Sequence, residues 1–422
     1  MNSSKYRQLK IVLHQASSLA AAALVDKEYD SRFNSNSALH WNYRVKKNLV
    51  FVNVVDELAV LLEQVWRSEL AIQKLWRVLP RAAQEQYLIS LLVSEIQATN
   101  EIEGIHSTRK EIRLAIKAAE KSSKGKASSR RFQEMAQTYL LLFGGLESGT
   151  AQFPKDLADT RELYDKLLAQ EIDNEDRLDG EFFRTGSVFV SDGQSDIHRG
   201  VEGEELINTG VQTLLEAQQD DEHVLGNAFV AHFILEHIHP FYDGNGRFGR
   251  FLLGLRLSEI LSAPTAISLS SEVLQQKRAY YKSFMVAEDE LNRGELTFFV
   301  IDMAKILVNA MEGLLESLRE KSNHLDSLNG RLQELNRKQA AEDDALEDKH
   351  LSLLFIMGQV YLFGPRSGVT LKELCEVTGL SQPTVREMTK SLRERGLIEE
   401  TSQRPLVFAL TQKALELLGL PD

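Results

Sequence analysis

One short stretch of this chain gathers side chains that could bind phosphate and move a proton. It reads HPFYDGNGRFGR over residues 239–250. His239 carries an imidazole that titrates near neutral pH, which suits a general base. Arg247 and Arg250 would lie on one side of a helical turn, and guanidinium groups donate planar hydrogen bonds to phosphate oxygens. The stretch could therefore hold a nucleotide's phosphates beside a group that deprotonates a hydroxyl.

The neighbouring sequence predicts how this stretch is positioned. Residues 228–238 are apolar at helical spacing, and Pro240 should end that helix because proline clashes with the preceding turn. Gly244 and Gly246 then allow a tight loop whose backbone N–H groups converge on an anion. Residues 247–261 predict a second helix. Phosphates over the loop would lie at its N-terminus, where the macrodipole favours negative charge.

The same residues allow other interpretations. Residues 244–249 spell GNGRFG, a dinucleotide-binding fingerprint, but that fingerprint follows a strand, and here a helix and a proline come first. An ordinary polar turn between two core helices would explain the proline and the glycines, but not the gathered charges. A zinc site would lack both the HExxH pattern and a cysteine. Its ligands would be His232, Glu236, His237 and His239.

The whole stretch resembles the signature of the Fic (filamentation induced by cAMP) family, HPFx[D/E]GN[G/K]RxxR, at every fixed position. Members of that family are mostly adenylyltransferases, which transfer AMP from ATP to a Ser, Thr or Tyr hydroxyl of a target protein. The resemblance implies a mainly α fold, with a Fic-type helical core and a β-hairpin flap. It also implies ATP as the substrate and Mg²⁺ as the cofactor.

The resemblance gives each matched residue a role. His239 would be the general base, and Phe241 would be a buried anchor for the loop. Asp243 is an unexpected acid beside phosphate, and Mg²⁺ bridging its carboxylate to the phosphates reconciles the two. An in-line attack on the α-phosphate needs positioning, charge neutralisation and a proton acceptor. The ATP phosphates would be bound by Gly244, Asn245, Gly246, Arg247 and Arg250.

A second motif resembles the inhibitory element of the family. Thr99, Glu103 and Gly104 match [S/T]xxxE[G/N] directly after an apolar helical run over residues 87–96. In the family this glutamate pairs with the second arginine and blocks the γ-phosphate, so Glu103 would pair with Arg250. The alternative is a helix that ends at Gly104 and leaves Glu103 in solvent. The glutamate supports AMP removal in some relatives, so the reverse reaction also stays open.

Residues 180–198 predict a β-hairpin ahead of the signature. Valines alternate as they do in a strand, and a turn-rich stretch follows them. The segment resembles the family's flap, to which a protein target adds a strand. An ordinary surface hairpin is the alternative.

Two adjacent aromatic residues follow the signature. Tyr280 and Tyr281 could stack near the adenine of ATP. They could equally be core aromatics of a helix, and the sequence does not choose between the two.

Length and composition limit the class of protein. The chain has 422 residues, a net charge of −12 and one cysteine, Cys375. This length predicts two or three domains, and the acidic balance gives no global basic field for nucleic acid or anionic lipid. A lone cysteine excludes an intramolecular disulfide and favours a reducing compartment. No apolar run reaches membrane-spanning length, so we expect a cytoplasmic protein with no membrane partner.

The chain predicts four regions. The third of them, a helical linker, carries leucines at near-heptad spacing, which predicts a helical connector or a homodimer seam. A basic, serine-rich loop is expected at residues 121–131 and an acidic hinge at residues 340–348. The regions are a helical N-terminal region with a strand-like piece at 49–52 (1–85), a Fic core including the inhibitory helix (86–310), the helical linker (311–348) and a winged helix-turn-helix (349–422).

The winged helix-turn-helix is predicted from turn and cap signals. Residues 370–380 indicate a helix and a glycine turn, and residues 397–398 and 406–409 indicate a wing. Ser381 and Pro383 are typical of a capped helix start. The candidate DNA contacts on this second helix are Arg386, Lys390 and Arg393.

Charge leaves the role of this region open. Its acidic residues nearly match its basic residues in number, whereas a phosphate-driven footprint should be clearly net positive. DNA binding and a protein-docking or dimerisation role therefore both remain.

Two function classes follow. The first is a Mg²⁺-dependent protein adenylyltransferase, inhibited by Glu103 paired with Arg250. The second is a DNA-binding transcriptional regulator whose Fic core senses nucleotide or modifies itself, and the two can coexist. The expected partners are ATP, a protein target on the flap and, in the second class, DNA; a homodimer is a further expectation.

Overall fold

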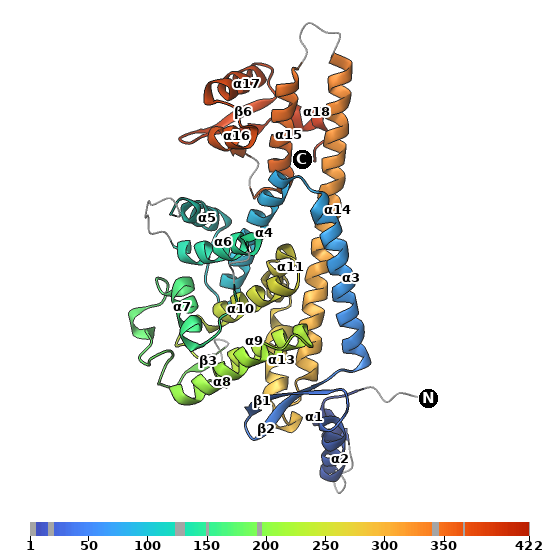
Figure 1. Cartoon of the computed structure of the whole chain (residues 1–422), viewed down its shortest axis with the longest axis vertical. Coiled ribbons are helices and arrows are strands. Elements are labelled where there is room, and N and C mark those ends of the chain that lie inside the picture. The colour runs from blue at the N-terminus through green and yellow to red at the C-terminus, as the bar shows by residue number, and fades with distance from the viewer. Residues whose placement is uncertain are drawn as a thin grey trace. The chain divides into compact units, whose positions relative to one another are not determined.

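A computed structural model describes residues 6–15, 21–122, 131–148, 152–191, 196–339, 346–365 and 368–421. The chain divides into two compact units, Met1–Glu69 with Ser94–Glu312 and Leu70–Val93 with Gly313–Asp422. Helices dominate both units (Figure 1), so the predicted mainly α fold is confirmed. Within the described ranges, every helix is too short or too polar to cross a membrane.

The first unit holds most of the elements. Three helices have residues in both units: α3 Asp56–Val78, α4 Arg81–Ile102 and α14 Thr297–Gln339. The other elements of the first unit are α1 Leu9–Gln15, α2 Ala21–Phe33, β1 Ala38–Val45, β2 Asn48–Asn53, α5 Arg109–Ser122, α6 Gln133–Ser148, α7 Leu157–Leu168, η1 Asn174–Asp176, β3 Phe189–Ser191, β4 Asp196–Arg199, α8 Glu204–Ala217, α9 Val224–Ile238, α10 Asn245–Ile260, α11 Ala263–Ala266, α12 Leu269–Gln275, α13 Lys277–Glu288 and η2 Glu290–Asn292.

The strand predicted near residues 49–52 is confirmed. β1 and β2 form an antiparallel hairpin. Phe51 on β2 joins this hairpin to the turn before α14, because its N–H donates to the Gly294 carbonyl at 3.1 Å and its own carbonyl accepts from Leu296 at 2.8 Å.

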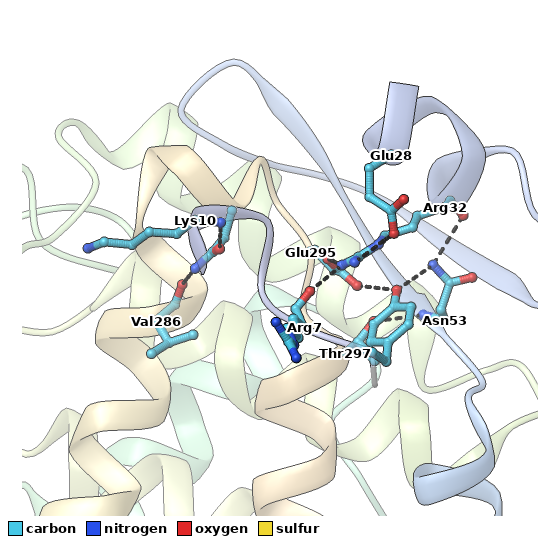
Figure 2. A network of polar contacts seen from close by, with 10 residues as sticks. Arg7, Lys10, Glu28, Arg32, Asn53, Val286, Glu295 and Thr297 are labelled. Carbon is cyan, nitrogen blue, oxygen red and sulfur yellow. Dashed lines mark hydrogen bonds and ion pairs between the residues drawn. The ribbon is translucent and has the colours of Figure 1, made fainter. Parts of the chain in front are cut away.

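A polar network holds the N-terminal segment in the first unit (Figure 2). Arg32 lies between two carboxylates, with Nη1 2.9 Å from Oε2 of Glu295 and Nε 2.9 Å from Oε1 of Glu28. Tyr6 donates to Glu295 and accepts from Nδ2 of Asn53. The side chains of Arg32 and Glu295 are 6% and 1% exposed, so removing either would leave a buried charge without its partner.

Two successive helices form the centre of the first unit. α9 is buried along most of its length because its sequence is almost wholly apolar, and α10 packs against it (Figure 1). Both helices were predicted. α10 begins at Asn245 rather than at residue 247, because Gly244 has a left-handed φ of 79° and is the residue that caps the helix.

The expected hairpin ahead of the signature is present. β3 pairs antiparallel with β4, and the N–H of Gly200 donates to the Val188 carbonyl at 3.1 Å beyond the two strands. The predicted turn at residues 192–195 lies outside the described residues. So does most of the basic loop predicted at 121–131, namely residues 123–130.

The second unit explains the leucine row of the predicted linker. α14 is one continuous helix, and all leucines of that row except the half-buried Leu335 are buried. Gly358 on α15 Asp348–Phe363 lies so close that a Cβ there would meet Cδ2 of Leu328 at 2.5 Å. Packing within the chain therefore accounts for the spacing without a second copy. Residues 340–345 of the expected hinge lie outside the described part. The buried leucines are Leu314, Leu318, Leu325, Leu328 and Leu332.

The predicted winged helix-turn-helix is also present. A capping box between Thr370 and Glu373 starts α16 Leu371–Thr378, and Ser381 caps α17 Gln382–Glu394, which has a proline in its first turn. The sheet has the order β5-β7-β6 and is antiparallel. Its strands are β5 Gly368–Thr370, β6 Ile398–Gln403 and β7 Leu406–Leu410, followed by α18 Gln412–Leu418.

Candidate functional site

His239 is the C-terminal cap of α9. Its N–H donates to the Leu235 carbonyl at 2.9 Å, and its backbone has a left-handed φ of 54°. This conformation costs a residue with a side chain roughly 1–2 kcal/mol, so the surrounding contacts must hold it. Nδ1 lies 3.0 Å from the Glu236 carbonyl. A carbonyl oxygen can only accept, so Nδ1 carries the proton and Nε2 carries the lone pair that a base requires.

The loop after His239 is braced by Asn245. Its Oδ1 accepts from the N–H of Phe241 at 2.9 Å, and its Nδ2 donates to the Phe241 carbonyl at 2.8 Å. The Phe241 ring is fully buried and stacks on Tyr164, with centroids 3.7 Å apart. The Tyr164 hydroxyl also donates to the Asp243 carbonyl at 3.0 Å. The shape of the loop is therefore set by its own side chains.

The glycines bring backbone donors to the start of α10. At Gly244 a Cβ would meet Cδ1 of Leu168 at 2.7 Å, so this close approach needs glycine. The first helical hydrogen bond runs from the N–H of Phe248 to the Gly244 carbonyl at 2.9 Å. The N–H groups of the preceding residues, including Gly246, lie before that bond and form the positive end of the macrodipole. This end of α10 is suited to an anion.

Arg247 lies in the first turn of α10 and is 2% exposed. Its Nη1 is 2.9 Å from Oε2 of Glu171, and its Nη2 is 3.3 Å from Oδ2 of Asp243. Burial raises the pKa of the Glu171 carboxyl, and the guanidinium of Arg247 opposes that shift. The sequence offered no signal for Glu171, which lies far upstream of the motif.

Arg250 is also 2% exposed and contacts the end of α4. Its Nη2 lies 2.7 Å from Oε1 of Glu103, and its Nε donates to the Thr99 hydroxyl at 2.9 Å. Burial disfavours the charged guanidinium, but the Glu103 carboxylate keeps the pKa of Arg250 above its usual value. A Cβ on Gly246 would meet Oε1 of Glu103 at 2.2 Å, so the carboxylate lies directly against the first turn of α10. Glu103 is thus paired with Arg250, although its side chain remains 30% exposed.

The turn that carries Glu103 is held from two sides. Gly104 has a left-handed φ of 73° and ends α4. The N–H of Ile105 donates back to the Asn100 carbonyl at 2.9 Å. Lys277, at the start of α13, donates from Nζ to the Ile102 carbonyl at 2.5 Å. A cation at a helix C-terminus is favourable, and the sequence did not predict this one.

Asp243 is the expected magnesium ligand. Its side chain is 52% exposed, and Oδ1 accepts from the N–H of Gly244 at 2.6 Å. No group of three or more His, Cys, Asp or Glu side chains suited to a metal occurs in the described part of the chain, and the zinc alternative gains no support. Mg²⁺ is commonly held by one or two carboxylates together with substrate phosphates. One accessible carboxylate beside an anion-binding helix start fits that pattern.

The two tyrosines after the signature differ in burial. Tyr280 is 2% exposed, and its hydroxyl lies 2.7 Å from Nε2 of His232. Burial lowers the pKa of His232 to about 3, so this imidazole is neutral. The core interpretation therefore holds for Tyr280. Tyr281 is half-buried, and burial followed by the Glu103 carboxylate raises its pKa, so it lies near the turn that carries Glu103.

The basic residues predicted on the second helix of the winged domain share one exposed stripe of α17. Two of them are partly neutralised. Nζ of Lys390 is 3.8 Å from Glu394, and Nη1 of Arg393 is 3.1 Å from Glu400. Arg386 belongs to the same stripe, and its side chain has no ion pair recorded within the described residues.

Comparison with known proteins agrees with these two sites. Residues 154–257 match the Fic/DOC family, and residues 362–402 match the IclR helix-turn-helix domain. The first match contains the whole His239–Arg250 motif but not the Thr99–Gly104 segment.

Among curated proteins, the chain is similar to two insect proteins named protein adenylyltransferase Fic. Identity is 30% over 145 residues with that of Drosophila mojavensis, covering 34% of this chain and 26% of the relative. It is 29% over 168 residues with that of Culex quinquefasciatus, covering 40% and 30%. The match thus spans less than a third of the relatives' length.

Among solved structures, a Fic family protein from Desulfovibrio desulfuricans aligns with a TM-score of 0.49 and 19% identity, covering 85% of this chain and 97% of that one. Fic-1 from C. elegans aligns with a TM-score of 0.45 and 16% identity, covering 74% and 81%. Residues 154–257 therefore form a Fic-type domain that carries the His239–Arg250 motif, and residues 362–402 form the helix-turn-helix of a C-terminal winged domain.

Proposed function

We propose that the Fic domain transfers AMP from ATP to a hydroxyl side chain of a target protein. One observation carries this proposal. A proton acceptor, backbone N–H donors and two buried arginines lie together at the start of α10. His239 presents Nε2 as the acceptor, while Arg247 and Arg250 lie in one helical turn and each pairs with a carboxylate. The curated relatives of this chain carry the name adenylyltransferase, which supports this reaction over other uses of a phosphate site.

The reaction would proceed by a single in-line displacement. The target hydroxyl gives its proton to Nε2 of His239 as its oxygen forms a bond to the α-phosphorus. The bond from that phosphorus to the bridging oxygen breaks, and pyrophosphate leaves. Arg247 and Arg250 would hold the outgoing phosphates through charge-assisted hydrogen bonds. Mg²⁺ held by Asp243 and the phosphates would neutralise part of their charge.

We further propose that the described arrangement is inhibited. The Glu103 carboxylate accepts from Nη2 of Arg250 and lies against Gly246. A terminal phosphate would need both of these contacts. A phosphate there would meet a carboxylate of like charge. Productive binding of ATP therefore requires the turn at residues 102–104 to move.

The test is transfer of radiolabel from [α-³²P]ATP with Mg²⁺ to protein. Glu103→Gly should label itself or proteins of a cell extract, and Glu103→Gly combined with His239→Ala should not. The proposal fails if the relieved variant labels nothing with ATP. Running CTP, GTP, UTP and diphosphate-linked donors in parallel shows whether a different donor takes its place.

The reverse reaction is an outcome of the same design. Protein labelled by Glu103→Gly is purified and then incubated with the unaltered chain and Mg²⁺. Release of AMP by the unaltered chain but not by Glu103→Gly would assign Glu103 to AMP removal rather than to inhibition alone.

A second function is favoured by the C-terminal domain. We propose that α17 enters a DNA groove, because its exposed stripe of Arg386, Lys390 and Arg393 lies on the second helix of a matched helix-turn-helix domain. The ion pairs of Lys390 and Arg393 with glutamates would reduce their phosphate contacts, so we expect a small salt dependence.

Gel-shift titration against genomic fragments tests this function. Arg386→Ala should weaken binding and lower the slope of log K against log salt by about one. Lys372→Ala, at an exposed lysine on α16 outside the stripe, is the control. A response that is flat across fragments at low salt would leave protein docking or dimerisation as the role of this domain.

A further inference from the structure

Arg184, which no part of the motif contains, is fully buried just ahead of the β3–β4 hairpin. All of its recorded hydrogen-bond acceptors are backbone carbonyls. Nε donates to His239 at 2.7 Å, and Nη2 donates to Val201 at 2.8 Å and to Ile238 at 3.1 Å. Nη1 donates to Gly186. One planar side chain therefore bonds to four carbonyls at once.

These carbonyls come from two functional segments. Gly186 and Val201 lie on either side of the hairpin along the chain, so they form its base. Ile238 and His239 are the last residue and the cap of α9. Two backbone hydrogen bonds also join the hairpin base to the end of α9, and we call this contact region the junction. The N–H of Val201 donates to the Ile238 carbonyl at 3.0 Å, and the N–H of Arg184 donates to the Pro240 carbonyl at 3.2 Å.

There is little free space at this junction. A Cβ on Gly200 would meet Nη2 of Arg184 at 2.5 Å and Cβ of His239 at 3.0 Å. The guanidinium of Arg184 and the side chain of His239 therefore share one close-packed site. A shift of the hairpin base by a fraction of an ångström would be transmitted to the backbone of His239.

Burying this guanidinium is costly. Burial lowers the pKa of Arg184, with partial compensation from the charges of Tyr242, Glu202 and Asp179. Neutral carbonyls offset less of the desolvation free energy of a guanidinium than a carboxylate would. An aliphatic side chain would therefore fill the same space with a smaller loss of stability. What an aliphatic side chain lacks is the fork of fixed donors that ties four carbonyls together.

We propose that Arg184 is a positioning residue that holds the base of the β3–β4 hairpin and the backbone of His239 in one rigid frame. A hydroxyl presented on the hairpin would then meet Nε2 of His239 at a set distance. The inference rests on the proposed transfer reaction for its consequence, but not for its geometry. None of the recorded bonds of Arg184 involves a phosphate-binding side chain.

The first measurement is made on the protein itself and needs no activity. Ring ¹⁵N spectra of His239 are recorded for the parent, for Arg184→Met and for Arg161→Met. Arg161 also donates to a backbone carbonyl, that of Phe182, but lies on α7 and has no recorded bond to the junction. We expect one tautomer, protonated at Nδ1, in the parent and in Arg161→Met, and a mixture in Arg184→Met.

The second measurement separates binding from turnover. In the Glu103→Gly background, Arg184→Met should lower kcat for protein labelling between about ten- and a hundredfold, as expected for misplacement of about 1 Å. KM for ATP should change less than about threefold, because Arg247 and Arg250 keep their contacts. Arg184→Lys retains the charge but not the planar fork of donors, so its kcat should lie between that of the Glu103→Gly parent and that of Arg184→Met. If Arg184→Met does not fold, Arg184→Lys provides both measurements.

Two results overturn the inference. One is an unchanged His239 spectrum in the Arg184 variants. The other is a rise in KM for ATP that matches the loss of rate, which would indicate a general structural role. If the Glu103→Gly parent transfers nothing, the proposed function fails, and the spectrum together with ATP binding by calorimetry still decides the role of Arg184.

Discussion

The contact between Glu103 and Arg250 predicts a graded release of activity. Glu103→Ala removes both the charge and the bulk that lie against Gly246, whereas Glu103→Gln removes the charge and keeps the bulk. Glu101→Ala is the matched control, because Glu101 belongs to the same last turn of α4 and is exposed. We expect labelling rates in the order Glu103→Ala, Glu103→Gln, then Glu101→Ala equal to the unaltered chain.

The magnitude follows from the geometry. The contact is a charge-assisted hydrogen bond of 2.7 Å between side chains that are 2% and 30% exposed. Such bonds contribute about 1.5–3 kcal/mol, and the partial exposure of the carboxylate favours the lower half of that range. Each 1.4 kcal/mol is a factor of ten, so Glu103→Ala should raise the initial rate about ten- to thirtyfold. A neutral amide retains about 1 kcal/mol, which leaves Glu103→Gln with a rise of about fivefold.

Initial rates with [α-³²P]ATP over a series of ATP concentrations provide the measurement. Thr99 still accepts from Nε of Arg250 in every variant, so the guanidinium stays oriented and its phosphate binding should persist. The reasoning is refuted if Glu103→Gln is as active as Glu103→Ala, because the bulk of the side chain at residue 103 would then have no effect. It is also refuted if Glu101→Ala is equally activated, because that would indicate general loosening of α4.

Three further predictions concern the surroundings of the site and the N-terminal network. Lys277→Met should raise basal labelling a few-fold, since it removes the cation from the end of α4, and Arg278→Met, at an exposed neighbour, should not. Burial raises the pKa of Glu95 to about 7, so the native chain keeps a proton that the unfolded chain loses near 4.5. Stability should therefore fall as pH rises through that window, and Glu95→Gln should flatten the change in urea midpoint between about pH 5 and about pH 7.5. Glu295→Ala should lower the free energy of unfolding in urea by about 3–5 kcal/mol, because it leaves Arg32 buried without its partner; a loss under about 1 kcal/mol would contradict the assigned burial.

Local signals in the sequence predicted local structure well. Pro240 and the glycines after it indicated where α9 stops and α10 starts, and Ser381 with Pro383 indicated the start of α17. These residues restrict their own backbone, so their effect can be worked out without knowing the rest of the fold. Of the pair of tyrosines, the sequence could not separate the core residue Tyr280 from its half-buried neighbour, because burial depends on what packs against a helix.

Contacts between distant segments had no such signal. A partner of Arg247 is Glu171, in the turn between α7 and η1, and nothing in the sequence distinguishes this acid in an acid-rich chain. Arg184 bonds to carbonyls, which every residue carries, so its role is visible only when the hairpin and α9 are in place. The pairing of Glu103 with Arg250 was expected from family resemblance rather than from spacing.

That pairing also has a consequence for how the protein responds to its own abundance. A carboxylate on the same chain as its arginine acts at a fixed effective concentration, on the order of millimolar for short flexible tethers. Its occupancy of Arg250 does not fall when the protein is diluted, as that of a separate inhibitor would. Resting output should therefore scale with the number of molecules and with nucleotide supply, while the fraction of active molecules stays constant from the lowest to the highest expression level.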